Sequence, residues 1–353
     1  MRADLALVGF GHVGRRFARL IEERRDWLAL DYDLECRIVG VATRSHGAVF
    51  RDSGLDAVGL AVQAEAGHTI ADAGAGAADS FEVIRRLAAS EAPLKVMVET
   101  TTLDITAGQP AIDHVRAALQ AGCHAVTANK GPTAFAFEEL SALAADRDLS
   151  FLFEGAVMDG VPIFNLVRET LPAVQITGLR GVVNSTTNHI LSALEDGEGF
   201  DAALQRMQDA GIAEADPSLD VDGWDAAAKV SALANVFMRA RTTPLAVERE
   251  GIGPATARIA MAAKARGGRV RLVASARTTP EGVLTSVRPV ELPETDLLAG
   301  LRGMANALVL QTDLLGEIAI CQMGGSLTQT AYALLSDLVT IRRRQRAANA
   351  AAR

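Results

Sequence analysis

In the first half of the chain, short apolar runs alternate with segments in which apolar residues recur every three or four positions. Residues 5–9 form the first run, which ends in glycine, as expected for a buried parallel strand. Helical spacing follows through Val13, Phe17 and Leu20. The alternation continues with strands expected at 37–42, 94–98, 125–128 and 151–153, and helices at 110–121 and 134–145. Short links between such elements predict a doubly wound parallel sheet covered on both faces.

The pattern changes after about residue 175. A strand is expected at 176–183, followed by an acidic, helix-rich stretch over 188–240. Two more strands are expected at 270–274 and 283–289, and a last helix begins near residue 328. Earlier in the chain, residues 58–78 are rich in Ala and Gly and are interpreted as helix plus loop.

A chain of 353 residues is too long for one simple core, so two domains are expected. We expect a dinucleotide-binding domain over 1–154, and a catalytic domain over 155–327. The C-terminal helix, about 328–353, is expected to pack back on the first domain. The predicted fold class is α/β, a Rossmann-type doubly wound parallel sheet plus an α+β domain.

Composition and charge exclude several classes of protein. The net charge of −8 argues against a nucleic-acid partner. Three widely separated cysteines make neither a disulfide framework nor a metal motif, which favours a reducing cytoplasm. No apolar run approaches the roughly 20 residues that cross a bilayer, and no signal-peptide pattern precedes the first strand. We therefore expect a cytoplasmic protein with no membrane or nucleic-acid partner.

A G-x-G-x-x-G pattern lies directly between the first expected strand and helix. Its residues are Gly9, Phe10, Gly11, His12, Val13 and Gly14. In this context the first glycine makes a tight turn, the second lets a pyrophosphate approach, and the third lets the helix pack closely. The phosphates would lie at the helix N-terminus. The pattern predicts a dinucleotide site, to which Thr100, after the third strand, is also assigned.

The end of the second strand bears on the choice between NAD and NADP. A carboxylate there would bind the ribose 2′-hydroxyl of NAD. This chain has Thr43, Arg44 and Ser45 and no carboxylate, so Arg44 is free to pair with a 2′-phosphate. NADP is slightly favoured, and NAD with a solvated Arg44 is the alternative.

Two lysines are candidates for proton transfer. Asp225 and Lys229 are four residues apart, so on a helix they share one face and can hydrogen-bond. They belong to an acidic segment, 211–229, that is alternatively a charged surface helix. Lys130 follows a strand of the first domain, and ligands bind at the carboxyl ends of such strands.

Together these stretches resemble the homoserine dehydrogenase family over nearly the whole chain. The similar segments are 9–14, 44–47, 127–132, 154–162, 184–191 and 211–229, with weaker similarity at 287–289 and 330–338. The resemblance implies an NAD(P)-dependent enzyme that interconverts L-homoserine and L-aspartate 4-semialdehyde, in the aspartate pathway to threonine and methionine. It also implies a homodimer formed through the second domain, and a short form without a regulatory or kinase domain.

The resemblance also implies roles for individual residues. Lys130 and Lys229 match the family's two catalytic lysines, and we favour Lys229, supported by Asp225, as the proton shuttle. The reverse assignment is the alternative. Four residues match the substrate pocket: Glu214, which takes the substrate ammonium, Asp220, Asn184 and Thr186. Four residues match a loop that holds Na⁺ or K⁺ mainly through backbone carbonyls: Glu154, Val157, Asp159 and Val161.

The chain departs from the family pattern at a few positions. The family usually has Gly at Ser185, and Tyr at His189 and Ile212. A lost hydrogen bond to a charged substrate group would cost roughly 1.5–3 kcal/mol if nothing replaced it. We expect the same substrate, and the alternative is another amino-acid-derived alcohol or aldehyde. A regulatory protein without catalysis is disfavoured because Lys130, Asp225 and Lys229 are retained.

Overall fold

The structure is a computed structural model that describes all residues except 210–212, 214–215 and 352–353. The described residues form two compact units. The first contains residues 1–132, 136–164 and 326–353, and the second contains residues 133–135 and 165–325. The chain therefore returns to the first unit for its last helix. The functional limits expected from the sequence, 1–154 and 155–327, stay a prediction.

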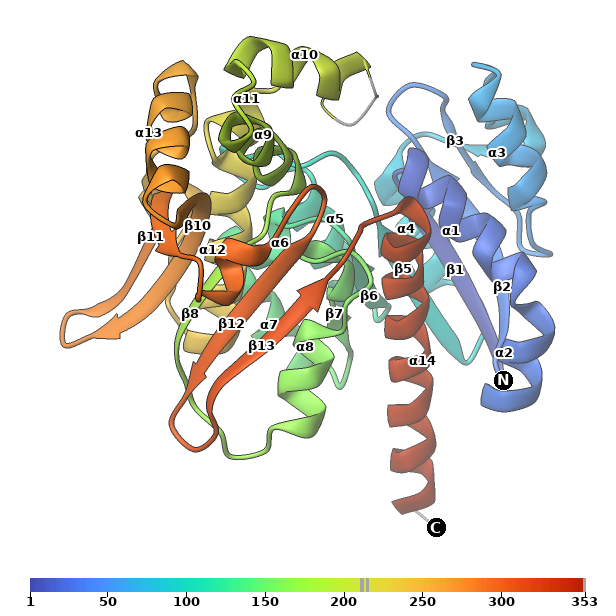
Figure 1. Cartoon of the computed structure of the whole chain (residues 1–353). Helices are drawn as coiled ribbons and strands as arrows, with labels where there is room; N and C mark the ends of the chain where they lie inside the picture. The colour runs from blue at the N-terminus through green and yellow to red at the C-terminus, as the bar shows by residue number, and fades with distance from the viewer. Residues whose placement is uncertain (210–212, 214–215, 352–353) are drawn as a thin grey trace. The chain divides into compact units, whose positions relative to one another are not determined.

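The first unit is built around a seven-stranded sheet with strand order β4-β3-β2-β1-β5-β6-β7 (Figure 1). The strands are β1 (Arg2–Val8), β2 (Glu35–Ala42), β3 (Ala48–Phe50), β4 (Ala75–Ala77), β5 (Leu94–Glu99), β6 (His124–Thr127) and β7 (Phe151–Leu152). From β2 to β7 all neighbours are parallel, as the Rossmann-type prediction requires.

One edge of this sheet is antiparallel, since β3 runs antiparallel to β2 and to β4. Only five residues, 43–47, separate β2 from β3. A parallel pair needs a crossover of a dozen or more residues, so this short connection forces an antiparallel pair. β4 falls in the Ala- and Gly-rich segment that was interpreted as helix plus loop, which does contain a helix, α3 (Ala57–Glu65).

Helices connect the strands of the first unit. They are α1 (His12–Glu23), α2 (Arg25–Tyr32), α3 (Ala57–Glu65), α4 (Ser80–Ala88), α5 (Ala111–Gln120), α7 (Phe137–Ala145), α14 (Leu327–Ala351) and the 3₁₀ turns η1 (Ala71–Ala73) and η2 (Glu154–Ala156). Two short helices, α6 (Gly131–Phe135) and α8 (Ile163–Asn165), lie where the chain passes between the units.

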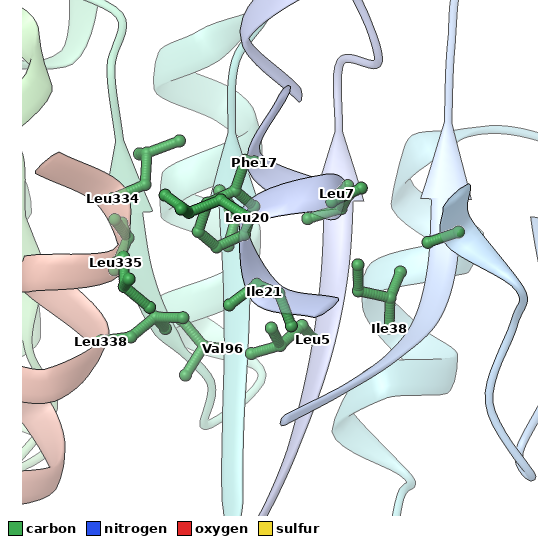
Figure 2. Packing of buried hydrophobic residues seen from close by; sticks show 14 of the residues in the cluster. Leu5, Leu7, Phe17, Leu20, Ile21, Ile38, Val96, Leu334, Leu335 and Leu338 are labelled. Atoms are coloured by element: carbon green, nitrogen blue, oxygen red, sulfur yellow. The ribbon is translucent and has the colours of Figure 1, made fainter. Parts of the chain in front are cut away.

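The core of the first unit lies between β1, α1 and α14 (Figure 2). Leu5 and Leu7 alternate along β1 and so point to the same face of the sheet. On α14, Leu334, Leu338 and Ile341 recur at helical spacing and are buried. Each fully buried side chain of this kind contributes about 1.5–3 kcal/mol, so the last helix is held firmly on the first unit.

The second unit contains a six-stranded sheet with strand order β13-β12-β8-β10-β11-β9. The strands are β8 (Ile176–Val182), β9 (Glu248–Arg249), β10 (Gly268–Thr279), β11 (Gly282–Pro293), β12 (Asn306–Thr312) and β13 (Gly316–Gln322). The strands expected at 270–274 and 283–289 are the central parts of a long hairpin. The hairpin of β12 and β13 was not predicted, because its four-residue apolar run, 307–310, fits a strand or a buried helix equally well.

The helix-rich stretch of the second unit is confirmed. Its elements are the π-helix η3 (Leu166–Thr170), α9 (Ser185–Glu195), α10 (Phe200–Asp209), α11 (Ser218–Val221), α12 (Trp224–Met238), α13 (Pro254–Ala265) and the 3₁₀ turns η4 (Pro244–Ala246) and η5 (Leu297–Gly300). The helices α9, α12 and α13 pack on β10.

A buried ion pair anchors α9 to the sheet of the second unit. Arg271 of β10 is completely buried and donates to the carboxylate of Glu195, at the end of α9. It also donates to the carbonyl oxygen of Ala299 at 2.8 Å. Removing one member of such a pair leaves an uncompensated buried charge, which costs about 3–5 kcal/mol. The pair therefore fixes the helix whose other end carries polar residues of the candidate site.

None of the described helices combines the length and the apolar character that a membrane crossing requires.

Candidate active site

The loop between β1 and α1 carries the G-x-G-x-x-G pattern, and its three glycines differ in their surroundings. Gly9 has a φ of +90°, and a Cβ there would lie 2.5 Å from the backbone carbonyl carbon of Thr100. A Cβ on Gly14 would lie 2.7 Å from the carbonyl oxygen of Gly9. Gly11 is exposed, and a Cβ built on it meets no atom within 4 Å. Close packing thus shapes the loop at Gly9 and Gly14, whereas Gly11 leaves open space for a ligand.

The N-terminus of α1 suits an anion. Gly11 is its N-cap, and within the described residues no side chain caps the helix or places a carboxylate in its first turn. The first N–H groups of such a helix attract phosphate. His12 is exposed at this end, while Val13 is half-buried against the core. Thr100 donates its hydroxyl to the carbonyl oxygen of Gly9 at 2.8 Å and so supports the loop from β5. The open space and the uncapped helix fit a dinucleotide.

Arg44 is exposed in the turn that follows β2. The turn is closed by Thr43, whose N–H and hydroxyl both donate to the carbonyl oxygen of Gly47 at 3.0 Å. The Thr43 hydroxyl also accepts from the N–H of His46 at 2.7 Å. β2 pairs with β1, so this turn and the glycine loop follow neighbouring strands at the same edge of the sheet.

Lys130 is half-buried and directly precedes α6, three residues after the end of β6. Because β6 is parallel to β5 and β5 to β1, Lys130 follows the same carboxyl edge as the glycine loop and Thr100. This is the edge at which ligands of doubly wound sheets bind.

A compact polar cluster lies in the second unit, where α9, α11 and α12 begin. The Lys229 ammonium is 3.0 Å from Oδ2 of Asp225, one helical turn earlier, and also donates to the carbonyl oxygen of Val183. The side-chain amide of Asn184, the N-cap of α9, donates to Asp225 at 2.9 Å and to Asp220 at 2.6 Å. The contact predicted from the four-residue spacing of Asp225 and Lys229 is thus present, and Asn184 joins this pair to a second carboxylate, that of Asp220.

The surroundings of Asp220 in this cluster alter its proton affinity. Burial raises its pKa above the ordinary value of 3.8, and the nearby negative charge of Asp225 raises it further. Hydrogen bonds from Asn184 and Thr186 and the charge of Lys229 oppose this rise only in part. The arrangement combines a cation, a carboxylate paired with it, and a second carboxyl group whose charged form is disfavoured.

Comparison with known proteins places this geometry in a family. The sequence profile of homoserine dehydrogenases matches residues 162–339, and that of the NAD binding domain of homoserine dehydrogenase matches residues 9–154. An NAD(+)-dependent homoserine dehydrogenase from Pseudomonas canavaninivorans is 36% identical over 96% of this chain and 95% of its own length. The chain belongs to the homoserine dehydrogenase family.

Solved structures of homoserine dehydrogenases share the fold. A putative homoserine dehydrogenase from Archaeoglobus fulgidus has a TM-score of 0.83 at 31% identity, covering 96% of this chain and 99% of that one. A mutant hyperthermophilic archaeal homoserine dehydrogenase in complex with NADPH has a TM-score of 0.80 at 28% identity, covering 98% of both chains. Membership makes this chain an NAD(P)-dependent oxidoreductase, an NAD(P)-dependent homoserine dehydrogenase.

The segment for which the sequence predicted a monovalent cation is a largely buried turn after β7. Glu154 is buried, and its side chain accepts from the N–H of Phe164 at 2.8 Å. Its backbone N–H donates to the buried carboxylate of Asp337 at 2.9 Å. Asp159 has a φ of +47° and accepts from the Thr330 hydroxyl at 3.0 Å.

Val157 is buried and Val161 half-buried in the same turn. The buried carboxyl groups of Glu154 and Asp337 lie beside this turn, and negative groups of this kind suit a monovalent cation.

Two positions named from the sequence, Glu214 and Ile212, lie outside the described residues. The two other departures from the family pattern make contacts within the second unit. Ser185 donates to the carbonyl oxygen of Met304 at 3.2 Å and accepts from the Asn306 amide at 2.9 Å. His189 pairs through Nε2 with Arg206 at 3.0 Å.

Sequence reasoning missed two features of the candidate site. One is the Val183 carbonyl, which no side-chain pattern could reveal. The other is Glu99, a completely buried carboxylate at the end of β5. The sequence did contain a signal for it. Glu99 directly follows an apolar run and precedes three threonines, and carboxylates are seldom found at the end of a buried apolar run.

Proposed function

We propose that this chain oxidises L-homoserine to L-aspartate 4-semialdehyde, and runs the reverse reduction, with Lys229 as the group that exchanges the proton of the substrate oxygen. The observation that carries the proposal is the Lys229–Asp225–Asn184–Asp220 cluster. The substrate alcohol loses a hydride to NAD(P)⁺ and a proton to the protein, giving the aldehyde and NAD(P)H. The nicotinamide accepts the hydride when it is bound, and the side chains of this cluster orient the substrate and handle the proton.

Lys229 is held for this task by two fixed acceptors. An ammonium has three N–H donors, and those of Lys229 are directed in part to Asp225 and to the Val183 carbonyl. During reduction a remaining proton of the Lys229 ammonium would pass to the substrate oxygen. During oxidation the Lys229 amine would take that proton back. Lys130 would polarise the same oxygen, and the exchange of these two roles is the alternative.

The carboxyl groups of the cluster provide for the rest of the substrate. Glu214 and Asp220 would take the substrate ammonium, and Asn184 and Thr186 would line the pocket beside the nicotinamide. Asp220 supports this assignment, because the disfavoured charge that raises its pKa would be relieved by an approaching ammonium.

For the cofactor, we propose a preference for NADP, with Arg44 pairing with the 2′-phosphate. The exposed Arg44 and the absence of a carboxylate in residues 43–47 support it. The relative from Pseudomonas canavaninivorans is described as NAD(+)-dependent, so NAD is the competing candidate. Arg44→Ala should raise the KM for NADP⁺ about 10-fold and leave the KM for NAD⁺ within about twofold. Equal effects on both cofactors would remove Arg44 from 2′-phosphate recognition.

We further propose a cytoplasmic homodimer that associates through the sheet of the second unit. The exposed Leu284, Leu314 and Leu315 on its two hairpins support this. Sedimentation should give about twice the chain mass of 37.1 kDa, and a monomer at micromolar concentration would refute the dimer.

A monovalent cation is proposed for the turn that contains Glu154, Val157, Asp159 and Val161. It would be structural, so potassium or sodium chloride should raise the melting temperature above that found in choline chloride at equal ionic strength. Identical melting temperatures would argue against a cation there.

The direct test of the activity is absorbance at the reduced-nicotinamide band with L-homoserine and either NADP⁺ or NAD⁺. 4-Hydroxybutanoate, which lacks the ammonium, is the matched control substrate. We expect reduction with L-homoserine and a kcat/KM at least about 10-fold lower with the control. Equal rates with both substrates would remove the ammonium site. No reduction by protein that binds cofactor would favour a different amino-acid-derived alcohol.

A further inference from the structure

Glu99 ends β5 as a completely buried carboxylate inside the first unit. Its Oε1 accepts from the backbone N–H of Thr101 at 2.9 Å and from the Thr101 hydroxyl. Its Oε2 accepts from the Thr127 hydroxyl at 2.9 Å. The nearest basic group among these contacts is the buried His114, whose Nδ1 is 3.9 Å from Oε1. A buried carboxylate is costly, and here hydrogen bonds from the loop after β5 and from the end of β6 compensate it.

The contacts of Glu99 continue to Lys130. The Thr127 hydroxyl, which donates to Glu99, also accepts from the N–H of Asn129 at 2.9 Å. The Asn129 amide donates to the carbonyl oxygens of Thr101 at 2.9 Å and Thr102 at 3.3 Å. Its Oδ1 accepts from the N–H of Gly131 at 2.8 Å. The residues on both sides of Lys130 are therefore fixed to the end of β5.

Close packing restrains the same backbone. A Cβ on Gly131 would lie 3.0 Å from both the Cα and the carbonyl oxygen of Gly108, in the loop after β5. The loop after β5 and the segment that carries Lys130 therefore pack against each other. A shift of either segment would break hydrogen bonds to the buried carboxylate of Glu99.

We propose that Glu99, Thr127 and Asn129 form a positioning network that sets the backbone, and through it the ammonium, of Lys130 for the reaction. None of the three needs to touch the substrate. The inference rests on the proposed role of Lys130. Glu99 acts mainly through Thr127, whose hydroxyl donates to the carboxylate at 2.9 Å and accepts from the backbone N–H of Asn129, the residue preceding Lys130, at 2.9 Å. The Thr101 hydroxyl makes a second and longer connection, because it donates to Glu99 and accepts from the Asn129 amide at 3.5 Å.

Thr127 offers the sharpest test. Thr127→Val keeps the shape of the side chain and removes the hydroxyl, whereas Thr127→Ser keeps the hydroxyl. We expect Thr127→Val to lower kcat for L-homoserine about 10- to 100-fold, since displacement of a catalytic group by an ångström can cost about 100-fold. Cofactor affinity should stay within about threefold, and Thr127→Ser should restore most of the turnover.

Ser90→Ala is a matched control. The Ser90 hydroxyl also donates to a buried carboxylate, that of Asp4, but near the amino end of β1. Its loss should lower the melting temperature about as much as Thr127→Val and leave kcat within about twofold. If both variants lost activity in proportion to stability, the network would be merely structural and the inference would be wrong.

A double-mutant cycle with Lys130→Ala separates this inference from the proposed function. If Thr127 acts through Lys130, Thr127→Val should cost nothing further in the Lys130→Ala background. The same fold loss in both backgrounds would overturn the inference while leaving Lys130 catalytic. Full activity of Lys130→Ala would instead refute the role of Lys130, and with it the purpose of the network. Should Thr127→Val fail to fold, Asn129→Ala in the same cycle tests the same connection.

Discussion

The cofactor loop of the first unit and the polar cluster of the second unit depend on different kinds of interaction. The loop depends on the absence of side chains at Gly9 and Gly14. At both positions backbone atoms lie 2.5–2.7 Å from the place that a Cβ would occupy. The cluster relies on side chains that meet: Asn184 reaches Asp220 and Asp225, which are 36 and 41 positions further along the chain. The first site is thus determined by local backbone shape and the second by tertiary packing.

This difference predicts different responses to mutation. A substitution in the loop should act through backbone strain and cofactor access, with the chemistry unaffected once cofactor is bound. A substitution in the cluster should leave cofactor affinity intact and change turnover.

The largest effect on folding stability is expected from the glycine loop. Gly9→Ala puts a Cβ at a positive φ and against Thr100, so it should cost about 1–3 kcal/mol of folding free energy and at least 10-fold in cofactor affinity. Gly11→Ala meets no protein atom, so stability should stay within about 0.5 kcal/mol while cofactor affinity falls about 10-fold. Thermal unfolding and cofactor titration distinguish the two. Equal stability of both variants would contradict the division of roles between the glycines.

A smaller effect is expected from Asp225→Asn in the cluster. The amide keeps the size of the side chain but removes the charge that faces Lys229 at 3.0 Å. Turnover should fall about 10- to 100-fold with cofactor affinity unchanged, because the lysine loses its fixed partner. Steady-state kinetics and cofactor titration measure the two quantities. A variant that lost cofactor affinity instead would show that the two sites are not separable.

The smallest effect is a pH-dependent change in stability at Asp220. Its pKa is raised in the folded protein, so the folded state is favoured at low pH and loses stability as pH rises from the ordinary value of 3.8 through the raised value. Asp220→Asn removes this loss and can still accept from Asn184. The melting temperature of the variant relative to the native protein should therefore rise as the pH increases above about 4. A constant or falling difference would contradict the cause assigned to the shift.

The sequence predicted the features that follow from local spacing. The alternating runs identified the parallel strands β1, β2, β5 and β6, and the glycine pattern fell between β1 and α1 as expected. The four-residue spacing of Asp225 and Lys229 sufficed to predict their contact. In each case the information lies within a few residues, where the periodicity of a helix or strand decides which side chains meet.

Features that depend on distant contacts were harder to predict. β3 and β4 have three residues each; a short turn places β3 beside β2, whereas β4 pairs with β3 only after an intervening segment that contains α3. Asn184 was assigned to the site by resemblance alone, and its hydrogen bond to Asp225 joins the N-terminal ends of α9 and α12, which are far apart in the sequence. Glu99 was overlooked because one of its partners, Thr127, ends a different strand, 28 positions further along the chain.

The central claim is that Lys229 exchanges the proton of the substrate oxygen while the first unit binds the cofactor. Turnover of L-homoserine by Lys229→Ala, measured beside cofactor affinity, tests this most directly. We predict a loss of about 10²–10⁴-fold in kcat with the cofactor dissociation constant unchanged, which is the usual contribution of general acid–base catalysis. Near-normal turnover in that variant would contradict the account.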